Sequence, residues 1–200
     1  MSISAPEAGV SKRRLYRLGK RAQKQAETRR RIVEAAVDLH STVGPARTSV
    51  AQIAVRAGVQ RHTYYAHFPD ERSLLLACSG FTMERDPLPD VEQWAALAPG
   101  AERIRRGLEE LYAWYERNAA MMSCVLRDAE FHGPTREIVE LRMGPTFRRL
   151  FELLGEGMAE RSQALLGVAL DFGCWRVLCR THGRAKAAAV MAEAIVRLAP

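Results

Sequence analysis

The chain has 200 residues, of which 48% are hydrophobic and 26% are charged, and its formal net charge at pH 7 is +7. This length and balance are typical of a globular, soluble protein with one or two domains. No apolar run approaches the ~18 residues that a transmembrane helix needs, and no secretory signal is present. We therefore expect a cytoplasmic protein with no membrane partner.

The positive charge is concentrated near the N-terminus. Residues 12–31 contain ten Lys or Arg against one acidic residue, Glu27, whereas residues 32–200 contain 20 basic and 21 acidic residues. Such a segment binds phosphates by releasing counterions, and it can lie in a minor groove of DNA. We predict a basic arm over residues 1–27, with Lys24 and Arg29 as candidate DNA contacts. A solvated tail is the alternative.

Residues 28–70 are predicted to form three helices. The inner stripe of the first consists of Ile32, Ala36, Leu39 and Val43. Gly44-Pro45 ends this helix. The apolar stripe of the second, spaced i, i+3, i+4 and i+7, consists of Val50, Ile53, Ala54 and Ala57.

The second and third helices are joined by a tight turn. Ser49 and Gln52 fit a capping box at the start of the second helix, and Gly58 stands where a left-handed residue must end it. The third helix, residues 61–67, carries polar and aromatic side chains, as a recognition helix in the major groove does. Its candidate base or backbone readers are Gln60, Arg61, His62, Thr63 and Tyr64. An ordinary helical hairpin is the alternative.

Residues 71–200 are predicted to form a second, helical domain. Asp70 is a natural N-cap for a linking helix over 71–84. Further helices are expected over 100–118, 121–131, 134–160, 162–181 and 185–198, with Gly144-Pro145 kinking or splitting the third of these. The predicted fold class is all-α, with an N-terminal helix-turn-helix DNA-binding domain and a C-terminal helical ligand-binding and dimerisation domain.

Two sequence patterns resemble the TetR family of bacterial transcription regulators. They are T-S-V-x-x-I-A-x-x-A-G-V at 48–59 and T-x-Y-x-H-F at 63–68, with Leu74 beyond. The resemblance covers about residues 28–84 and is weak after that. It implies an all-α homodimer, a small-molecule pocket in the second domain, and repression that the ligand releases.

The resemblance also implies roles for single residues. Thr48 and Tyr65 are expected near phosphates, although Tyr65 could instead be mainly packing. Two positions depart from the family pattern: His62 stands where a small residue is common, and Glu71 stands where a Lys often meets a phosphate. Arg72, next to Glu71, is the candidate substitute for that Lys.

The last two helices are candidates for a dimer interface, because two helices repeated by a two-fold axis give a four-helix bundle. The interface candidates are Phe172, Trp175, Cys179, Met191 and Ile195. The alternative is that these apolar faces complete the core of the monomer. A dimer would place two recognition helices about one DNA turn apart, roughly 34–36 Å, to match a palindrome.

Aromatic and methionine side chains are candidates for the lining of a ligand pocket. They are Tyr112, Tyr115, Met122, Phe131, Met143, Phe147 and Trp175. Such a lining favours a hydrophobic ligand; the alternative is that most of these residues are core. Asp128 and His132 are spaced i, i+4, but two ligands make no metal site, so no metal or cofactor is expected.

The sequence thus predicts a regulator, acting at the nucleoid, that represses from a palindromic operator and is released by a small, largely apolar ligand. A nucleoid-type protein that binds DNA through the arm alone is the first alternative. It would show little sequence preference and a steep salt dependence. A small helical enzyme is the second, but the chain shows no phosphate loop, G-x-S-x-G, H-E-x-x-H or G-x-G-x-x-G.

Overall fold

The computed structural model describes residues 12–198, and every regular element in that range is helical. The α-helices are α1 Lys12–Thr42, α2 Val50–Ala57, α3 Arg61–His67, α4 Glu71–Arg85, α5 Ala101–Ala129, α6 Gly133–Leu154, α7 Glu160–Leu170, α8 Phe172–His182 and α9 Arg184–Arg197. Two short 3-10 helices are η1 Pro45–Arg47 and η2 Val91–Trp94. The predicted all-α fold class is confirmed.

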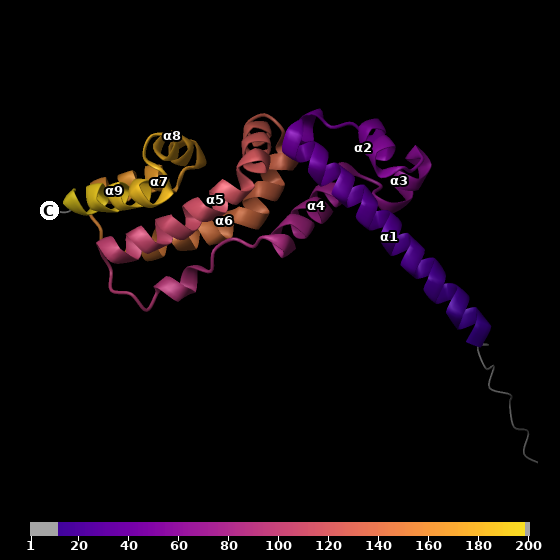
Figure 1. Ribbon diagram of the computed structural model, residues 1–200, viewed down its shortest axis with the longest axis horizontal. Helices are drawn as coiled ribbons and strands as arrows, with labels where there is room; N and C mark the ends of the chain where they lie inside the picture. Colours follow the sequence, from indigo (N-terminus) through magenta and orange to yellow (C-terminus); the bar gives the residue numbers. More distant parts are fainter. Residues whose placement is uncertain (1–11, 199–200) are drawn as a thin grey trace, which may run out of the picture.

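The molecule is elongated, with a small helical unit at one end and a larger one at the other (Figure 1). The small unit, called the head here, is built from α1, α2 and α3. Its buried core consists of Ile32, Val33, Ala35, Ala36, Ile53, Ala57, Tyr64 and Phe68, with Leu74 and Cys78 from α4. The N-terminal half of α4 thus completes the core of the head.

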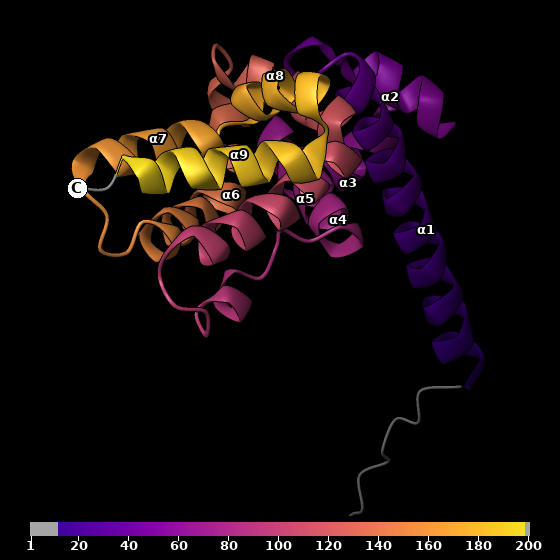
Figure 2. The same cartoon turned by 60° about the vertical axis from the view of Figure 1, so that its left-hand side comes forward.

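The larger unit, called the body here, is built from α5 to α9. The long helix α5 packs against α6 and α9, and Figure 2 shows α9 between α7 and α8 on one side and α5 and α6 on the other. Met83, near the end of α4, packs against the core of the body. Because α4 contributes to both cores, the domain division at residues 70 and 71 remains a prediction.

Three helix boundaries differ from the sequence expectation. The segments 100–118 and 121–131 are one helix, α5, because no Gly or Pro interrupts the chain between them. The segment 162–181 is two helices, because the Asp171 carboxylate accepts a hydrogen bond from the Cys174 backbone N–H (2.8 Å) and starts α8 there. The helix expected over 134–160 ends at Leu154.

Helix α6 continues through Pro145, where a kink or split was expected. Proline removes the hydrogen bond to the carbonyl four residues earlier, here that of Leu141. Leu141 is 51% exposed, so water can reach this part of the helix. The missing bond is therefore tolerated without ending the helix.

The described part of the basic arm is helical. Residues 12–27 continue α1 without interruption, and Figure 1 shows this segment projecting from the head into solvent. Residues 1–11 of the predicted arm lie outside the described residues. Over the described part of the chain, no helix is both long and apolar enough to cross a bilayer.

Candidate functional site

The turn between α2 and α3 has the predicted geometry. The Ser49 hydroxyl accepts a hydrogen bond from the Gln52 N–H (3.3 Å), and the Gln52 side chain accepts one from the Ser49 N–H (2.8 Å). This is the expected capping box. Gly58 is left-handed, with φ 64° and ψ 40°, and its N–H bonds the Val55 carbonyl. A local pattern of three sequence positions, Ser49, Gln52 and Gly58, therefore sets where α2 begins and where it ends before α3.

Helix α3 presents a polar face to solvent. Gln60, Arg61 and His62 are exposed at its N-terminal end, and the Thr63 hydroxyl lies 3.3 Å from His62 Nε2. Tyr65 is 53% exposed, so its side chain is available to a partner. These exposed side chains are the ones that a groove of DNA could reach.

Tyr64 corrects the predicted set of base readers. Its side chain is 3% exposed and packs against Phe68, with ring centroids 6.0 Å apart, and edge-on against Tyr65. On a seven-residue helix, two neighbouring residues point in different directions, and here Tyr64 faces the core. Burial also raises the pKa of Tyr64 to about 12. Its role is packing.

Two of the candidates outside α3, Thr48 and Arg72, form hydrogen bonds within the chain. The Thr48 hydroxyl donates to the Gly44 carbonyl (2.7 Å) at the turn before α2. Arg72 Nε donates to the Glu137 carboxylate of α6 (2.8 Å), so in this structure Arg72 ties α4 to the body. Nearby, Glu71 Oε1 lies 3.5 Å from His132 Nε2.

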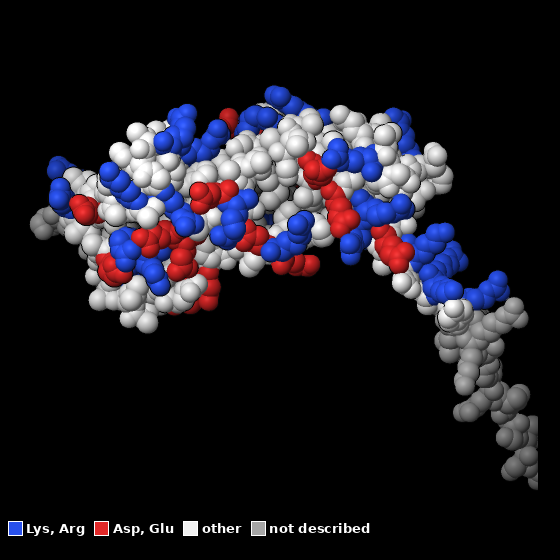
Figure 3. Space-filling model, in the orientation of Figure 1, with Lys and Arg blue, Asp and Glu red and all other residues white. Residues whose placement is uncertain are grey.

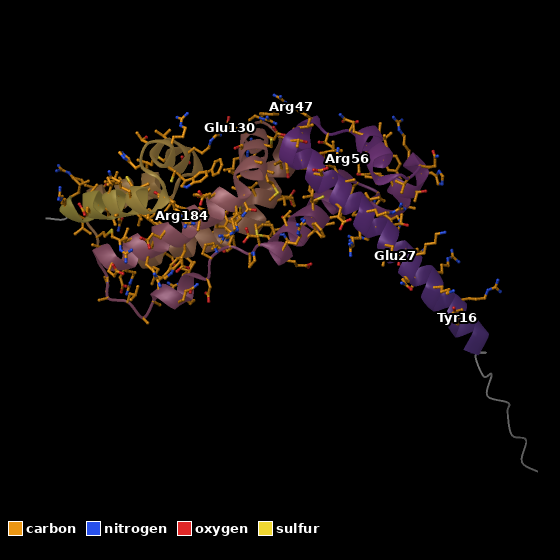
Figure 4. The ribbon with its side chains drawn as sticks, viewed as in Figure 1. Tyr16, Glu27, Arg47, Arg56, Glu130 and Arg184 are labelled. Atoms are coloured by element: carbon orange, nitrogen blue, oxygen red, sulfur yellow. The ribbon has the colours of Figure 1, made fainter. Side chains whose placement is uncertain are left out.

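The arm carries exposed positive charge. Arg17, Lys20, Arg21 and Lys24 of the arm, and Arg31 just after it on α1, are exposed and form no ion pair with any described residue. Figure 3 shows Lys and Arg gathered along this helix, whereas acidic and basic side chains are mixed over the body. Figure 4 shows Tyr16 and Glu27 on the projecting segment.

Arg29 joins the arm to the head. Its guanidinium carbon lies 4.8 Å from the centroid of the Phe68 ring, the residue that caps α3. A cation over an aromatic face is an attractive contact. The base of the arm is therefore held beside the recognition helix.

A polar clasp that sequence reasoning missed joins the head to the body. Asp128, fully buried at the end of α5, accepts a hydrogen bond from the Ala46 N–H (2.9 Å), and Arg127 donates to the Val43 carbonyl (2.8 Å). Gly44, at φ 104°, passes so close that a Cβ would clash with both side chains. Figure 4 places Arg47 and Glu130 at the same junction.

Asp128 and His132, the pair spaced i, i+4, each have hydrogen-bond partners of their own. Asp128 is bonded to Ala46 and Arg127, and His132 Nδ1 lies 2.8 Å from the Thr135 hydroxyl. No group of three His, Cys, Asp or Glu side chains suited to a metal occurs among the described residues.

A cavity of about 80 Å³, called the inner cavity here, lies at the junction of head and body. Its lining comes from α1, η1, α4, α5 and α6: Val37, His40, Pro45, Leu75, Cys78, Ser79, Thr82, Met83, Asp86, Trp114, Asn118, Met121, Met122, Val125, Thr135, Ile138, Val139, Arg142 and Met143. A groove of about 580 Å³, called the outer groove, opens between α6 and the α7–α8 corner. Met122, Val139 and Met143 line both spaces and separate them.

Of the predicted pocket residues, Met122 and Met143 line the inner cavity, and Tyr115 and Phe147 line the outer groove. Tyr112 is a correction: it is fully buried and its hydroxyl donates to the Ala169 carbonyl (2.8 Å).

Two further pocket candidates are corrected. Trp175 is core, packed against Tyr115 and Phe172 at centroid distances of 5.5 and 5.2 Å. Phe131 is 61% exposed beyond the end of α5, so it lines neither space. Spacing along α5 and α8 did not distinguish core from cavity, because both are apolar.

The predicted dimer residues are also corrected. Phe172, Trp175, Met191 and Ile195 are at most 8% exposed and belong to the core of the body, so they face inward rather than toward a partner. Cys179 is half-buried against the same core. The exposed apolar residues of α8 and α9 are Val177, Val190 and Val196.

Comparison with known proteins gives a family and a fold. Residues 32–78 match the family model for bacterial regulatory proteins of the tetR family. No curated protein matches the chain.

Solved structures share the fold over most of the chain. A TetR-family transcriptional regulator from Mesorhizobium loti MAFF303099 has a TM-score of 0.58 and 18% identity, covering 87% of this chain and 97% of that chain. A regulator from Streptomyces coelicolor A3(2) has a TM-score of 0.55 and 22% identity, covering 86% and 98%. The regulator FadR from Bacillus subtilis, in complex with stearoyl-CoA, has a TM-score of 0.57 and 18% identity, covering 83% and 96%.

The family match falls on the helices that hold the capping box, the left-handed Gly58 and the recognition helix, and the fold match extends over the body. Residues 32–78 therefore match the tetR family of bacterial regulatory proteins, and most of the chain shares the fold of solved TetR-family regulators.

Proposed function

We propose that this protein is a homodimeric repressor that binds a palindromic operator at the nucleoid and releases it when a small ligand occupies the body. The observation that carries the DNA-binding half is the exposed polar face of α3 beside the unpaired basic helix of the arm. Both project from the same end of the molecule (Figure 1). Gln60, Arg61, His62 and Thr63 are the proposed readers, with Thr48 and Tyr65 near phosphates.

The arm is proposed to follow the phosphate backbone. Arg17, Lys20 or Arg21, Lys24 and Arg31 recur at helical spacing, so they share one face over about 21 Å of helix. A helix with side chains is about 10–12 Å wide, whereas a B-DNA minor groove is about 6 Å wide. Residues 12–27 therefore suit the phosphate edges better than the floor of the minor groove.

Arg31 connects this basic face to the helix-turn-helix. Its guanidinium lies beside the turn at Gly58, 4.0 Å from where a Cβ would stand. The basic face thus begins at the turn between α2 and α3 and runs outward. We infer that DNA held by α3 also meets the arm, which adds affinity and salt dependence more than sequence choice.

Dimerisation is proposed to use the outer face of α8 and α9, where Val177 and Val190 are 56% and 43% exposed. Val177→Glu combined with Val190→Glu should leave the fold intact, because both side chains point outward, and should shift the protein to monomer in sedimentation equilibrium. Phe172 and Trp175 are unsuitable for this test, because their removal would damage the core.

Release is proposed to act through α4. This helix supplies Leu75, Ser79 and Met83 to the inner cavity, and its first turn is tied to α6 by Arg72 and Glu137. A ligand that binds one position of α4 better than another shifts the equilibrium between them. Because α4 also completes the core of the head, that shift would move the recognition helix.

The test of this function is selection from random duplexes near physiological salt, followed by sequencing. Enrichment of a palindrome is the expected result. Binding without an enriched sequence would instead favour the nucleoid-type protein, and no binding would overturn the proposal. Arg61→Ala should weaken binding to the selected operator by about 1–3 kcal/mol and relax its sequence preference. Arg161→Ala, an exposed arginine of α7, removes the same charge far from the head and should change neither.

A further inference from the structure

The inner cavity lies between the head and the body rather than within either. Val37 and His40 reach it from α1 and Pro45 from η1, while Trp114 and Met122 reach it from α5. A ligand in this space would therefore contact the first helix of the DNA-binding head directly. Its chemistry can be inferred from the hydrogen-bonding state of the polar groups that line the cavity.

His40 is a buried polar residue of the lining whose side chain has no hydrogen-bond partner among the described residues; the indole N–H groups of Trp94 and Trp175, outside the lining, also have none. His40 is 5% exposed, it lines the cavity, and neither ring nitrogen forms a hydrogen bond with any described residue. Burial lowers the pKa of His40 to about 4, against the opposing effect of nearby Asp128. The ring is therefore neutral near pH 7, with one N–H donor and one acceptor nitrogen.

The charged groups of the lining are already occupied. The Asp86 carboxylate accepts hydrogen bonds from Arg117 (2.9 Å) and Asn118 (2.8 Å). Arg142 is exposed and forms no ion pair with a described residue; it donates to the Ser79 hydroxyl (3.1 Å) and the Leu76 carbonyl (3.3 Å). Water therefore solvates its charge, so a charged ligand would find no buried, unpaired counter-charge, and an isolated charge in an apolar site is costly.

The hydroxyls of Thr82 and Thr135 and the amide of Asn118 are further polar groups of the lining. Thr82 Oγ1 donates to the Ser79 carbonyl (3.0 Å), and the Thr135 hydroxyl lies against His132 Nδ1. The Asn118 amide N–H donates to Asp86 and to the Trp114 carbonyl, which leaves its oxygen as a neutral acceptor. Apart from the exposed Arg142 guanidinium, the lining therefore offers neutral hydrogen-bonding atoms.

The remaining lining sets the size and type of the ligand. Met83, Met121, Met122, Met143 and Trp114 give an apolar surface in which thioether sulfurs can contact an aromatic ring. The volume of about 80 Å³ is near the scale of an engineered cavity of ~150 Å³ that binds benzene, and flexible methionines can adjust. It is far below the ~300–1,000 Å³ of sites for larger molecules.

We propose that the inner cavity binds a neutral, single-ring aromatic compound with one hydroxyl group, and that His40 holds this hydroxyl. The regulatory consequence, altered operator affinity, rests on the function proposed above. Binding itself does not. Because His40 belongs to α1, the ligand would join the head to α5 and α6 through its own contacts.

The test is isothermal titration of the purified full chain with three matched probes: phenol, toluene and benzoate. Phenol should bind roughly five-fold more tightly than toluene, the gain expected for one hydrogen bond. Benzoate, an anion of similar size, should not bind measurably. Equal affinity for phenol and toluene, tighter binding of benzoate, or no binding of any probe would each overturn the proposal.

Two substitutions locate the contact. His40→Phe should remove the preference for phenol while toluene still binds, and His40→Gln, which keeps a donor and an acceptor, should restore part of it. His182→Phe, at the exposed end of α8, is the control and should behave as the parent chain. A preference for phenol that survives in His40→Phe would rule out His40. Circular dichroism of each variant checks the fold.

Operator binding is measured on the same proteins. Failure of the ligand proposal can then be distinguished from failure of the proposed function. Loss of phenol binding with intact operator selection would overturn only the ligand class. Phenol binding that leaves operator affinity unchanged would overturn release by the ligand but not the ligand class. Phenol binding with no selected operator would contradict the function proposed above.

Discussion

The arm and the body use arginine in opposite ways. In the body, Arg103, Arg105 and Arg117 each form ion pairs with carboxylates of the same chain. On the described side chains between residues 16 and 31, Arg30 pairs with Glu34, whereas Arg17, Lys20, Arg21 and Lys24 form no ion pair with a described residue. Figure 3 shows the result as mixed charge over the body and mainly basic side chains along the projecting part of α1.

The paired arginines of the body stabilise the fold, whereas the basic side chains of the arm are available to bind an external anion such as a phosphate. A paired arginine lowers the pKa of its carboxylate, as Arg117 does for Asp86 through their hydrogen bonds. Like charges spaced i, i+4, such as Arg17 and Arg21, disfavour a helix by about 0.2–0.5 kcal/mol. The arm therefore carries a small cost within the chain that phosphates would relieve.

The largest expected effect on stability comes from substituting Arg103, which is buried in the body. It is 4% exposed and donates to the carbonyls of Leu97 (2.7 Å) and Leu153 (3.2 Å) and to Glu156 (2.6 Å). Arg103→Ala leaves buried acceptors without donors and should lower the free energy of unfolding by about 3 kcal/mol. Urea unfolding followed by circular dichroism measures this change.

Arg106→Ala is the matched control for Arg103, because Arg106 is exposed on the same helix and lies 3.8 Å from Glu110. Its loss should cost no more than about 0.5 kcal/mol. Equal losses for the two variants would show that burial does not distinguish the arginines of the body.

Acid should place a positive charge on the buried His40 ring at the junction of head and body. His40 has a pKa of about 4 in the folded chain against 6.5 when exposed. Between these values the unfolded chain binds a proton that the folded chain does not. Stability is therefore fully present above pH 6.5 and falls as the pH drops toward 4, by about 2 kcal/mol between pH 7 and pH 5.

The measurement for His40 is urea unfolding at pH 7 and pH 5 for the parent chain and for His40→Gln. The glutamine variant does not titrate, so it should lack this part of the loss. Carboxylates contribute equally to both proteins and cancel in the difference. Parallel losses in the two proteins would mean that His40 is not buried as the structure has it.

Substitutions in the arm should weaken DNA binding and leave the free energy of unfolding unchanged. Lys20→Ala with Lys24→Ala removes two proposed phosphate contacts per subunit. The salt dependence, expressed as the slope of log K against log[salt], should become shallower by about 1.8 per subunit, and affinity should fall roughly tenfold. Fluorescence anisotropy on operator and on unrelated duplexes measures both, and the loss should be similar on each.

The control for the arm is Arg106→Ala with Arg161→Ala, which removes the same charge from the body. Its salt dependence should match that of the parent chain. A change in urea stability in the arm variant, without a change in the salt dependence, would show that the arm serves the fold.

Local signals explain why the head was predictable from sequence. Ser49, Gln52 and Gly58 lie within ten positions, and each acts on its own turn of chain, so the helix-turn-helix could be recognised before packing was known. Tyr64 could not be assigned in this way. Its direction depends on how a short helix docks onto α1 and on where Phe68 lies.

The lining of the inner cavity could not be predicted from sequence either, because it depends on how helices that are distant in sequence pack together. His40, Leu75, Trp114 and Ile138 are separated by more than twenty residues each, and only the packing of four helices brings them together. The resemblance directed attention to aromatic residues of the second domain, and the contribution of α1 was missed. A histidine on the inner face of the first helix, at i+4 from Ala36, was the available signal.

The smallest expected effect concerns the ion pair of Arg56 with Asp38, which joins α2 to α1 within the head. Both side chains are about half exposed, at 52% and 49%, so water screens the pair. Arg56→Ala should lower the free energy of unfolding by no more than about 0.5 kcal/mol. If Arg56 contacts DNA, as is proposed for the arginines of the arm, Arg56→Ala will weaken the free energy of operator binding by more than it lowers the free energy of unfolding. A loss above about 1 kcal/mol in urea with unchanged operator affinity would instead group Arg56 with the paired arginines of the body.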